Sequence, residues 1–347
     1  MNVRHLLVGT LGLSAVVAAH AQSTVTLYGL LDVAAASFSR TAAADDGMYK
    51  LNTDTGSSSR FGLRGTENLG GGLSAFFNLE SPVDLKSGAV SGAFWRRNAY
   101  VGLRGSFGEV TFGRYYTAAV IKQAGTLSAT PSGINTGMGL TLLSQGISND
   151  FWNSNQIRYD SPRLGPVDFA VHVALGEGTT GRNVGGNVRF LQGPVAVSLS
   201  VQKDENLAGM SVTWTMLSGS YDFGGFKLHA GANTVDNDDG VAGFVDSSLW
   251  TVGGKFKATK QLTLAAQYWT VKEKVGTPTS SKLLVLNADY ALSKRSFLYA
   301  MFGYADSKDL GIAPLWGNGN FTTGTAGDVR AANDKNHGLA IGIRHVF

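Results

Sequence analysis

The chain ends with the stretch His337-Gly-Leu-Ala-Ile-Gly-Ile-Arg-His-Val-Phe347, in which apolar residues alternate with small or polar ones. In an extended strand one face would carry Leu339, Ile341, Ile343 and Phe347, and the other face Gly338, Ala340, Gly342 and Arg344. An apolar strand that runs to the chain end is unusual in a soluble protein, where a terminal strand is often frayed. We interpret it as a strand that closes a sheet in lipid, with its terminal aromatic residue at the membrane interface.

The first residues have the pattern of a secretory signal. Arg4 supplies a basic start, an apolar run covers residues 6–19, and Ala19-His20-Ala21 matches an A-x-A cleavage site. The run is too short to cross a bilayer, which takes about 20 residues. We therefore expect residues 1–21 to be a cleaved signal peptide and residues 22–347 to be the exported chain. The alternative is a buried N-terminal helix.

The composition favours a membrane protein built from strands. Charged residues make up 16% of the chain, against about 25% in a typical soluble protein, while there are 46 glycines, 7 prolines and no cysteine. No apolar stretch after the signal approaches the length of a membrane-spanning helix. The formal charge of +4 is weakly basic, and no basic run with interleaved aromatic residues predicts a nucleic-acid surface.

Alternation with a period of two continues through the chain. In one example Val195, Val197, Leu199 and Val201 alternate with Ala196, Ser198, Ser200 and Gln202. Short glycine-containing turns alternate with longer polar stretches near residues 41–57, 83–92, 118–152, 178–182, 204–209, 236–247, 273–281 and 306–334. Short connections at one end and long connections at the other are typical of a membrane-spanning meander.

This alternation predicts about sixteen strands. We expect them near residues 24–39, 59–67, 73–81, 94–105, 109–117, 154–162, 167–177, 183–192, 195–204, 210–223, 226–235, 248–258, 262–273, 282–292, 296–305 and 336–347. In lipid every backbone polar group must be paired, so the sheet has to close. The predicted fold is one transmembrane antiparallel barrel on the order of 30 Å wide, too wide for side chains to fill. A soluble β-sandwich or propeller is the alternative.

Several segments resemble the general porins of the Gram-negative outer membrane, in the neisserial and related proteobacterial branch. The segments are Thr24–Asp32, Ser59–Leu73, Arg96–Arg97 with Val101–Arg114, and Gly342–Phe347. The resemblance implies a sixteen-stranded, water-filled barrel narrowed by its third long loop, which folds inward. It also implies a homotrimer in the cell outer membrane, in contact with lipid and lipopolysaccharide, and passage of small inorganic and organic ions.

The alternation also predicts which side chains face the lumen. Arg60 and Arg64 would point inward opposite Phe61 and Leu63; the same argument turns Arg96, Arg104 and Arg158 inward and Arg97 toward lipid. Arg60, Arg96 and Arg158 fall near mid-height, and the resemblance gives them the role of a basic pore constriction. The alternatives are ordinary lumenal arginines or ion pairs between strands, and a β-bulge would invert any single orientation.

Other charged residues are candidates for the pore lining. Arg114 leads into the third long stretch, although its parity points outward, and that stretch contains Lys122 and Asp150 as its only charged residues. Lumenal carboxylates that would oppose the arginines are Asp32, Glu80 and Asp289. With so few acidic residues in the narrowing loop, we predict a weak to moderate preference for anions.

Aromatic residues near strand ends fit interfacial girdles, and good strand formation explains them equally well. The examples are Tyr100, Phe112, Tyr159, Phe190 and Tyr268. The resemblance further makes Phe347 the signal that the outer-membrane assembly machinery recognises.

Two other functions remain as alternatives. A barrel hydrolase would need a catalytic constellation, and His172, His229, His337 and His345 show no partner spacing for one. A substrate-specific channel would need an aromatic slide or a dense lysine ladder, and neither is evident in the sequence. No metal or cofactor motif is present, so no cofactor is expected.

Overall fold

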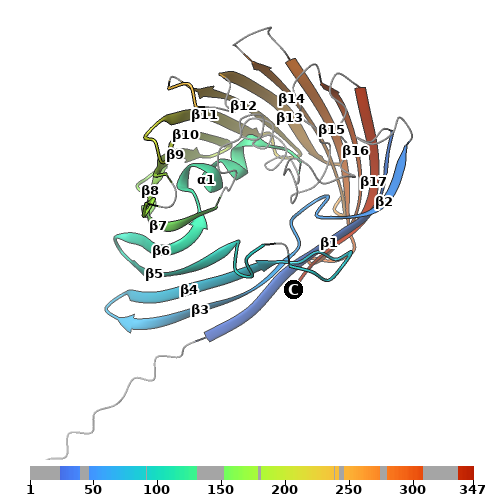
Figure 1. Ribbon diagram of the computed structural model, residues 1–347. Coiled ribbons are helices and arrows are strands. Elements are labelled where there is room, and N and C mark those ends of the chain that lie inside the picture. The colour runs from blue at the N-terminus through green and yellow to red at the C-terminus, as the bar shows by residue number, and fades with distance from the viewer. Residues whose placement is uncertain are drawn as a thin grey trace, which may run out of the picture.

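The chain forms a closed antiparallel β-barrel (Figure 1). The computed structural model describes residues 24–39, 47–90, 92–130, 152–178, 181–237, 239–241, 246–273, 280–307 and 335–347. The first strands are β1 (Thr24–Phe38), β2 (Met48–Thr53), β3 (Arg60–Gly70), β4 (Leu73–Pro82), β5 (Asn98–Gly105) and β6 (Gly108–Tyr116). After helix α1 (Ala118–Leu127) come β7 (Trp152–Asp160), β8 (Val167–Ala174), β9 (Asn183–Gln192), β10 (Val195–Glu205), β11 (Ser211–Asp222) and β12 (Phe226–Asp236). The last strands are β13 (Ser247–Lys257), β14 (Leu262–Glu273), β15 (Ser280–Ala291), β16 (Ser296–Ser307) and β17 (Lys335–Val346).

The two ends of the chain close the barrel. β1 pairs antiparallel with β17, from Leu30 opposite Val346 to Phe38 opposite Gly338. Beyond β17, the backbones of Gly29 and Phe347 exchange two N–H···O hydrogen bonds of 3.1 Å. The interpretation of the last eleven residues as a closing strand is therefore confirmed.

Seventeen strand segments occupy sixteen positions around the barrel. β2 pairs with the second half of β1, from Val33 to Phe38, while β3 pairs with its first half, from Thr24 to Leu30. The two segments thus form one position that is interrupted at residues 54–59. The prediction of sixteen strands is confirmed, but the expectation of a loop throughout residues 41–57 is wrong, because β2 extends the wall there.

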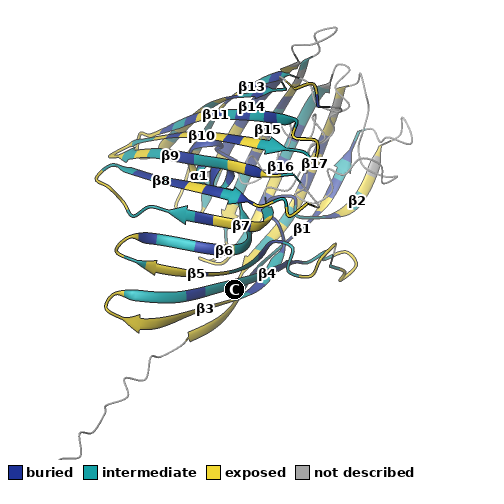
Figure 2. Cartoon of the chain, turned by 60° about the vertical axis from the view of Figure 1, so that its left-hand side comes forward, coloured by how far each residue is buried: buried dark blue, intermediate teal, exposed yellow. Residues whose placement is uncertain are grey.

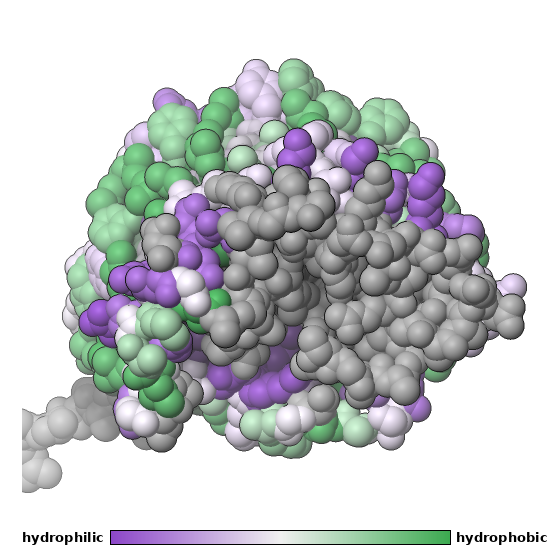
Figure 3. Space-filling model, turned by 45° about the horizontal axis from the view of Figure 1, so that its top comes forward, coloured by the Kyte–Doolittle hydropathy of each residue, from purple (hydrophilic) through white to green (hydrophobic). Residues whose placement is uncertain are grey.

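The alternation of side chains separates an apolar outside from a polar inside. On β10, Leu199 and Val201 are exposed on the outer face, whereas Ser198 and Ser200 are buried on the inner face. Trp250 of β13 likewise projects outward and is 48% exposed. Hydrophobic residues cover the outer wall and hydrophilic ones gather toward the mouth (Figure 3). Such a surface is suited to lipid outside and water inside.

One end of the barrel has short turns (Figure 2). The β3–β4 turn uses Gly71 and Gly72 with φ of 59° and 80°, a conformation that glycine adopts without steric cost. The last described residue, Phe347, and the first strand residue, Thr24, belong to the seam at this end. In outer-membrane barrels the short turns face the periplasm.

Helix α1 lies inside the barrel against β8 to β12 (Figure 1). Thr117 caps its first turn, since the Thr117 Oγ1 accepts the N–H of Val120 at 3.4 Å. Ala119, Val120 and Leu127 pack on an apolar patch of the inner wall that includes Trp214 and Met216 of β11. The third long stretch therefore does fold inward, although the helix within it was not predicted. Residues 131–151 of that stretch lie outside the described residues. No helix among the described residues is long and apolar enough to cross a bilayer.

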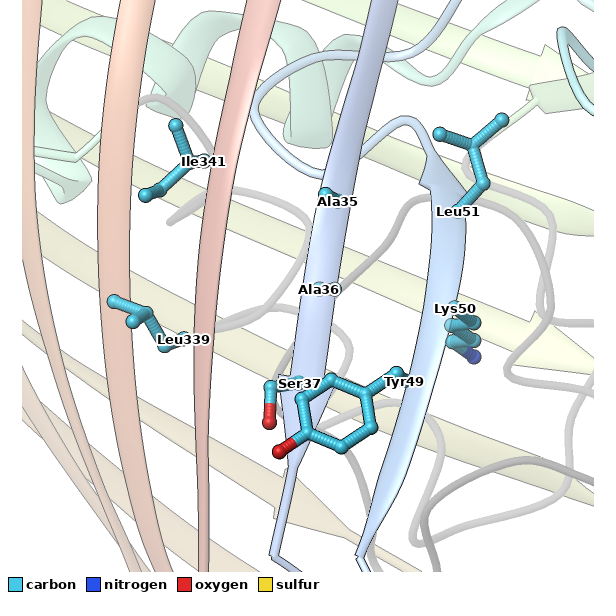
Figure 4. Close-up of a pocket in the computed structure, with 8 residues that line it drawn as sticks. All are labelled: Ala35, Ala36, Ser37, Tyr49, Lys50, Leu51, Leu339 and Ile341. Atoms are coloured by element: carbon cyan, nitrogen blue, oxygen red, sulfur yellow. The ribbon is translucent and has the colours of Figure 1, made fainter.

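A shallow groove runs along the outer face at the closing seam (Figure 4). Ala35 and Ser37 of β1 form its floor, because their side chains are short. Larger side chains stand on both sides, from β2 and from β17; they are Tyr49, Leu51, Leu339 and Ile341. The space measures about 460 Å³. It is an outward-facing feature and does not belong to the lumen.

Candidate functional site

The first group of charges on the lumen wall is built around Glu80 of β4. The Nε of Arg97 lies 2.6 Å from one Glu80 carboxylate oxygen, and the Nε of Arg60 lies 3.5 Å from the other. The Tyr28 hydroxyl donates a further hydrogen bond to Glu80 at 2.8 Å. Two cations thus share one carboxylate, and the group keeps a net charge of +1.

Arg60 is the member of this group that is most accessible from the lumen. Its side chain is 29% exposed, compared with 7% for Arg97, and its Nη1 donates to the Ser58 carbonyl oxygen at 2.7 Å. The position agrees with the inward orientation expected for Arg60 at the start of β3.

The expected lipid-facing orientation of Arg97 is wrong. Besides its ion pair with Glu80, Arg97 donates to the Tyr116 hydroxyl at 3.0 Å and lies over the Trp152 ring at 4.7 Å. The reason is that β5 begins at Asn98, not near residue 94, so the strand alternation does not extend to Arg97. A buried carboxylate on the neighbouring strand then determines where the guanidinium points.

A second group of charges lies farther around the wall, below α1. The guanidinium of Arg158 forms two hydrogen bonds with Asp160, of 2.6 and 2.7 Å, and its side chain is only 3% exposed. Lys122 of α1 lies 3.0 Å from Asp160 and 4.0 Å from Asp168, which also pairs with Arg189 at 2.8 Å. Three cations and two carboxylates again leave a net charge of +1. Arg158 points inward as expected, but its side chain is buried.

Arg96 and Arg114 meet just above β5. Both are half-buried, and Arg114 donates its Nε–H to the Arg96 carbonyl oxygen at 2.5 Å and its Nη1–H to Ser154 Oγ at 2.9 Å. These bonds hold Arg114 along the wall, in agreement with its outward parity. Arg96 precedes β5, so the height expected for it from strand counting does not apply.

Asp32 is buried in the wall beneath the interruption between β2 and β3. It accepts hydrogen bonds from the Tyr299 hydroxyl at 2.7 Å and from the Gly56 N–H at 3.2 Å. A Cβ atom at Gly56 would lie 2.8 Å from the Asp32 carboxylate, so this segment can approach so closely only with glycine. Asp32 is inaccessible to solute, with 0% exposure, and Asp289 is paired with Arg344 at 3.3 Å.

The lumen is narrowed from two opposite sides. Residues 54–59 are mostly buried and contact β1, β16 and β17, while α1 covers β8 to β12 half a turn away around the barrel (Figure 1). The charged group around Glu80 adjoins the first side, and the group around Asp160 adjoins the second. Both groups lie on one part of the wall, because Arg97 donates to the Tyr116 hydroxyl and Arg158 donates to the Tyr116 carbonyl oxygen.

Polar side chains hold α1 in place. The Gln123 amide donates to Ser200 Oγ and to the Met216 carbonyl oxygen, both at 2.9 Å, and accepts a hydrogen bond from Ser218. At the start of the helix the Ala118 N–H donates to Nδ1 of His172 at 3.2 Å. Sequence reasoning missed these contacts, since scattered Ser, Gln and His residues carry no pattern. The pairing of Thr117 with a following apolar run was the one available signal for the helix.

Three further candidates lie nearer the ends of the barrel. Arg64 and Arg104 face the lumen below Glu80 in the periplasmic half, as parity predicted. Phe347 places its ring against Gly29, where a Cβ atom would lie 2.3 Å from the Phe347 Cζ. The girdle expectation for Tyr100 is wrong, because Tyr100 shares the inward face with Asn98 and its ring centroid lies 4.4 Å from that of Tyr115.

Comparisons with known proteins agree with this architecture. Residues 9–310 match the family of Gram-negative porins. Outer membrane porin protein 32 of Delftia acidovorans is 32% identical over 95% of this chain and 96% of its own length. The major outer membrane protein P.IB of Neisseria meningitidis serogroup B is 29% identical over 45% of this chain and 46% of its own. An anion-selective porin from Comamonas acidovorans, of known structure, superimposes with a TM-score of 0.79 at 28% identity, covering 94% of this chain and all of that one.

Proposed function

The chain belongs to the family of Gram-negative porins and is an outer-membrane channel for passive diffusion, and from this premise we propose that the channel has a weak to moderate preference for anions. The relative of known structure from Comamonas acidovorans is described as anion-selective, which supports the same preference here. The solutes are small inorganic and organic ions and small hydrophilic molecules.

One observation carries the proposed preference: cations outnumber carboxylates in both charged groups of the wall. Arg60 and Arg97 share Glu80, and three cations share Asp160 and Asp168. Fixed positive charge on low-dielectric walls raises the local concentration of anions in a narrow aqueous path. Arginine keeps its charge at every accessible pH, so the guanidinium charges of both groups persist.

We assign the constriction to Arg60, Arg96 and Arg158 and the neighbouring lining to Arg64, Arg104, Arg114, Lys122, Glu80 and Asp32. Their roles differ with exposure. Arg60 would meet the solute, whereas Arg158 is buried and would act through the field of the Asp160 group. Asp32 is buried beneath residues 54–59 and belongs to neither group. Arg97 joins the constriction as the partner of Glu80.

The test is a reversal potential in a KCl gradient across a planar bilayer. We expect the sign that corresponds to faster passage of Cl⁻ than of K⁺. Arg60→Gln should reduce the ratio of anion to cation permeability by about half, because it removes the exposed charge of the Glu80 group. Faster passage of K⁺ through the wild-type channel would overturn the proposed preference.

We also propose how the chain is processed and assembled. Residues 1–21, which lie outside the described residues, would be removed as a signal peptide, leaving residues 22–347 as the barrel. We propose a homotrimer surrounded by outer-membrane lipid and lipopolysaccharide, inserted by the outer-membrane assembly machinery through Phe347. Conductance steps in groups of three in single-channel records would support the trimer, and solitary steps throughout would contradict it.

We further propose that the protein has no catalytic activity. His172 accepts the N–H of Ala118, and His229 Nδ1 lies 3.2 Å from the Thr126 carbonyl oxygen, so both histidines contact the backbone of the α1 segment. Hydrolysis of lipid or peptide substrates that disappeared in a His172→Gln, His229→Gln double variant would overturn this.

A further inference from the structure

A concave space of about 400 Å³ lies on the lumen face of the periplasmic half of the barrel. It is bordered by residues of β1 and of β3 to β6, below the Glu80 group. Six of them carry the argument: Arg64, Phe76, Asn78, Tyr100, Arg104 and Tyr115. Two arginines and three aromatic rings thus share one side of the wall.

The two arginines are accessible and cover aromatic rings. The Arg64 guanidinium carbon lies 5.0 Å from the Tyr28 ring centroid, and that of Arg104 lies 4.6 Å from the Phe76 centroid. Arg104 donates its Nε–H to Glu109 at 2.5 Å and is 49% exposed. Among the described residues no carboxylate forms an ion pair with Arg64. The space therefore keeps a surplus positive charge.

The rings form a continuous aromatic surface between these arginines. The Phe76 and Tyr100 centroids lie 6.2 Å apart in an edge-to-face arrangement, and those of Tyr100 and Tyr115 lie 4.4 Å apart. Asn78 lies opposite Tyr100 on the neighbouring strand and donates an amide N–H to the Tyr28 hydroxyl at 2.9 Å. No local pattern predicts this surface, because its three rings come from three different strands.

We propose that this space binds organic anions that carry a carboxylate on a flat aromatic ring. A guanidinium group offers paired N–H donors that match a carboxylate, and its planar face stacks on a ring. Neighbouring aromatic residues add edge or stacking contacts to the ring of the solute. The proposal rests on the channel function and adds a solute class to it.

This solute class follows from the combination of charge and rings. An inorganic anion would use the arginines alone, and acetate lacks a ring for Phe76 and Tyr100. A neutral aromatic molecule would lack the ion pair. Benzoate has both parts and is small enough for a space of this volume. Its binding has to be weak, since a solute that passes through a channel must also leave.

The experiment compares benzoate with acetate as blockers of Cl⁻ current through the full-length channel, added on the periplasmic side. We expect benzoate to halve the current at about one fifth of the acetate concentration. Arg64→Gln and Arg104→Gln should raise both half-blocking concentrations. Tyr100→Leu should raise only that of benzoate, by about fivefold.

Lys255→Gln is the matched control, because Lys255 lies on the inward face of β13 on the far side of the barrel. It removes one lumenal charge without altering the aromatic surface and should leave the ratio of the two blocking concentrations unchanged. Saturation-transfer NMR of benzoate with detergent-solubilised protein measures contact with the ring independently of current, and this signal should fall in Tyr100→Leu.

The outcomes separate the two proposals. A channel with Cl⁻ preference that is blocked equally by benzoate and acetate would overturn the aromatic site and leave the anion preference intact. A channel that prefers K⁺ but shows a benzoate block that depends on Tyr100 would overturn the anion preference and leave the aromatic site intact. Loss of the benzoate effect in Lys255→Gln as well would show that general lumenal charge is responsible, and would also overturn the site.

Discussion

At the scale of single residues, Glu80 restrains the positive charge of the lumen. Its carboxylate is 6% exposed and contacts Arg60, Arg97 and Tyr28. Glu80→Gln keeps most of the side-chain shape but removes the negative charge, so the group would change from +1 to +2. We predict about a twofold rise in the ratio of anion to cation permeability, measured as a reversal potential.

Glu67→Gln serves as the control for this change. Glu67 belongs to the neighbouring strand β3, where it pairs with Ala75 of β4 and is exposed on the opposite face from Arg64. An equal shift in reversal potential from both variants would mean that overall charge, and not the Glu80 group, determines selectivity. Thermal stability of Glu80→Gln should fall as well, since Arg97 loses a charged partner.

At the same scale, Arg60 could be placed from sequence and Arg97 could not. Arg60 lies within an alternating run that continues to Gly65, so period two fixes its face. Arg97 precedes its strand, and its direction depends on Glu80, 17 positions earlier in the chain and on another strand. Local pattern carries no information on such a partner.

At the scale of elements, α1 should be the part of the lumen most sensitive to a single neutral substitution. Gln123→Leu would remove the hydrogen bonds of the Gln123 amide to Ser200, Ser218 and the Met216 carbonyl oxygen in a buried site. The cost should be about 1–3 kcal/mol of docking free energy. We expect noisier single-channel currents, because the helix would leave the wall more often.

Gln261→Leu, in the exposed β13–β14 turn, is the comparison variant, and its current noise should match that of the wild type. If Gln123→Leu gave records as quiet as those of Gln261→Leu, the polar contacts would not be what holds α1.

The loop between β12 and β13 provides a prediction on pH. Hydrogen bonds from the Ser211 hydroxyl and backbone N–H, at 2.7 and 2.8 Å, lower the pKa of Asp239 below its ordinary value of 3.8. A lowered pKa means that this contact stabilises the folded state above pH 3.8 and is lost as the pH falls below it. Asp239→Ala should therefore lower the unfolding temperature slightly at pH 7 and not at about pH 2. An equal effect at both pH values would contradict this account.

Among the elements, β14 was predicted with the same bounds that the structure has, Leu262–Glu273, because clear alternation is framed by polar turns. β2 was missed, since its six residues follow a polar stretch and gain stability only from the second half of β1. Helix α1 was missed because its main partners, such as Trp214 and Met216, lie on distant strands.

At the scale of the whole molecule, closure depends on a close fit between the two chain ends. The Gly29 backbone bonds to Phe347, and a Cβ at Gly29 would also lie 2.7 Å from the Arg60 carbonyl oxygen. Gly29→Ala should therefore destabilise the barrel by about 1–3 kcal/mol, because the added methyl group would force the Phe347 ring and the Arg60 backbone to move. Urea unfolding in lipid vesicles measures this; Gly225→Ala, where a Cβ meets no atom within 4 Å, is the control.

Deletion of Phe347 tests assembly at the same scale. We predict a lower yield of assembled protein, whereas the channels that do form should keep their conductance and selectivity, since the ring lies outside the lumen. A normal trimer yield from this variant would count against an assembly role for Phe347.

Trp214 is buried beneath α1, so its intrinsic fluorescence can report whether the helix stays against the wall. Trp214 is 1% exposed inside the barrel, whereas Trp250 is 48% exposed on the outer wall. A brominated lipid should quench the fluorescence of Trp250 and spare that of Trp214. In a variant that retains Trp214 alone, departure of the helix would admit water and shift the emission to longer wavelengths. Spectroscopy could thus follow the narrowing of the channel in vesicles without any electrode or attached dye.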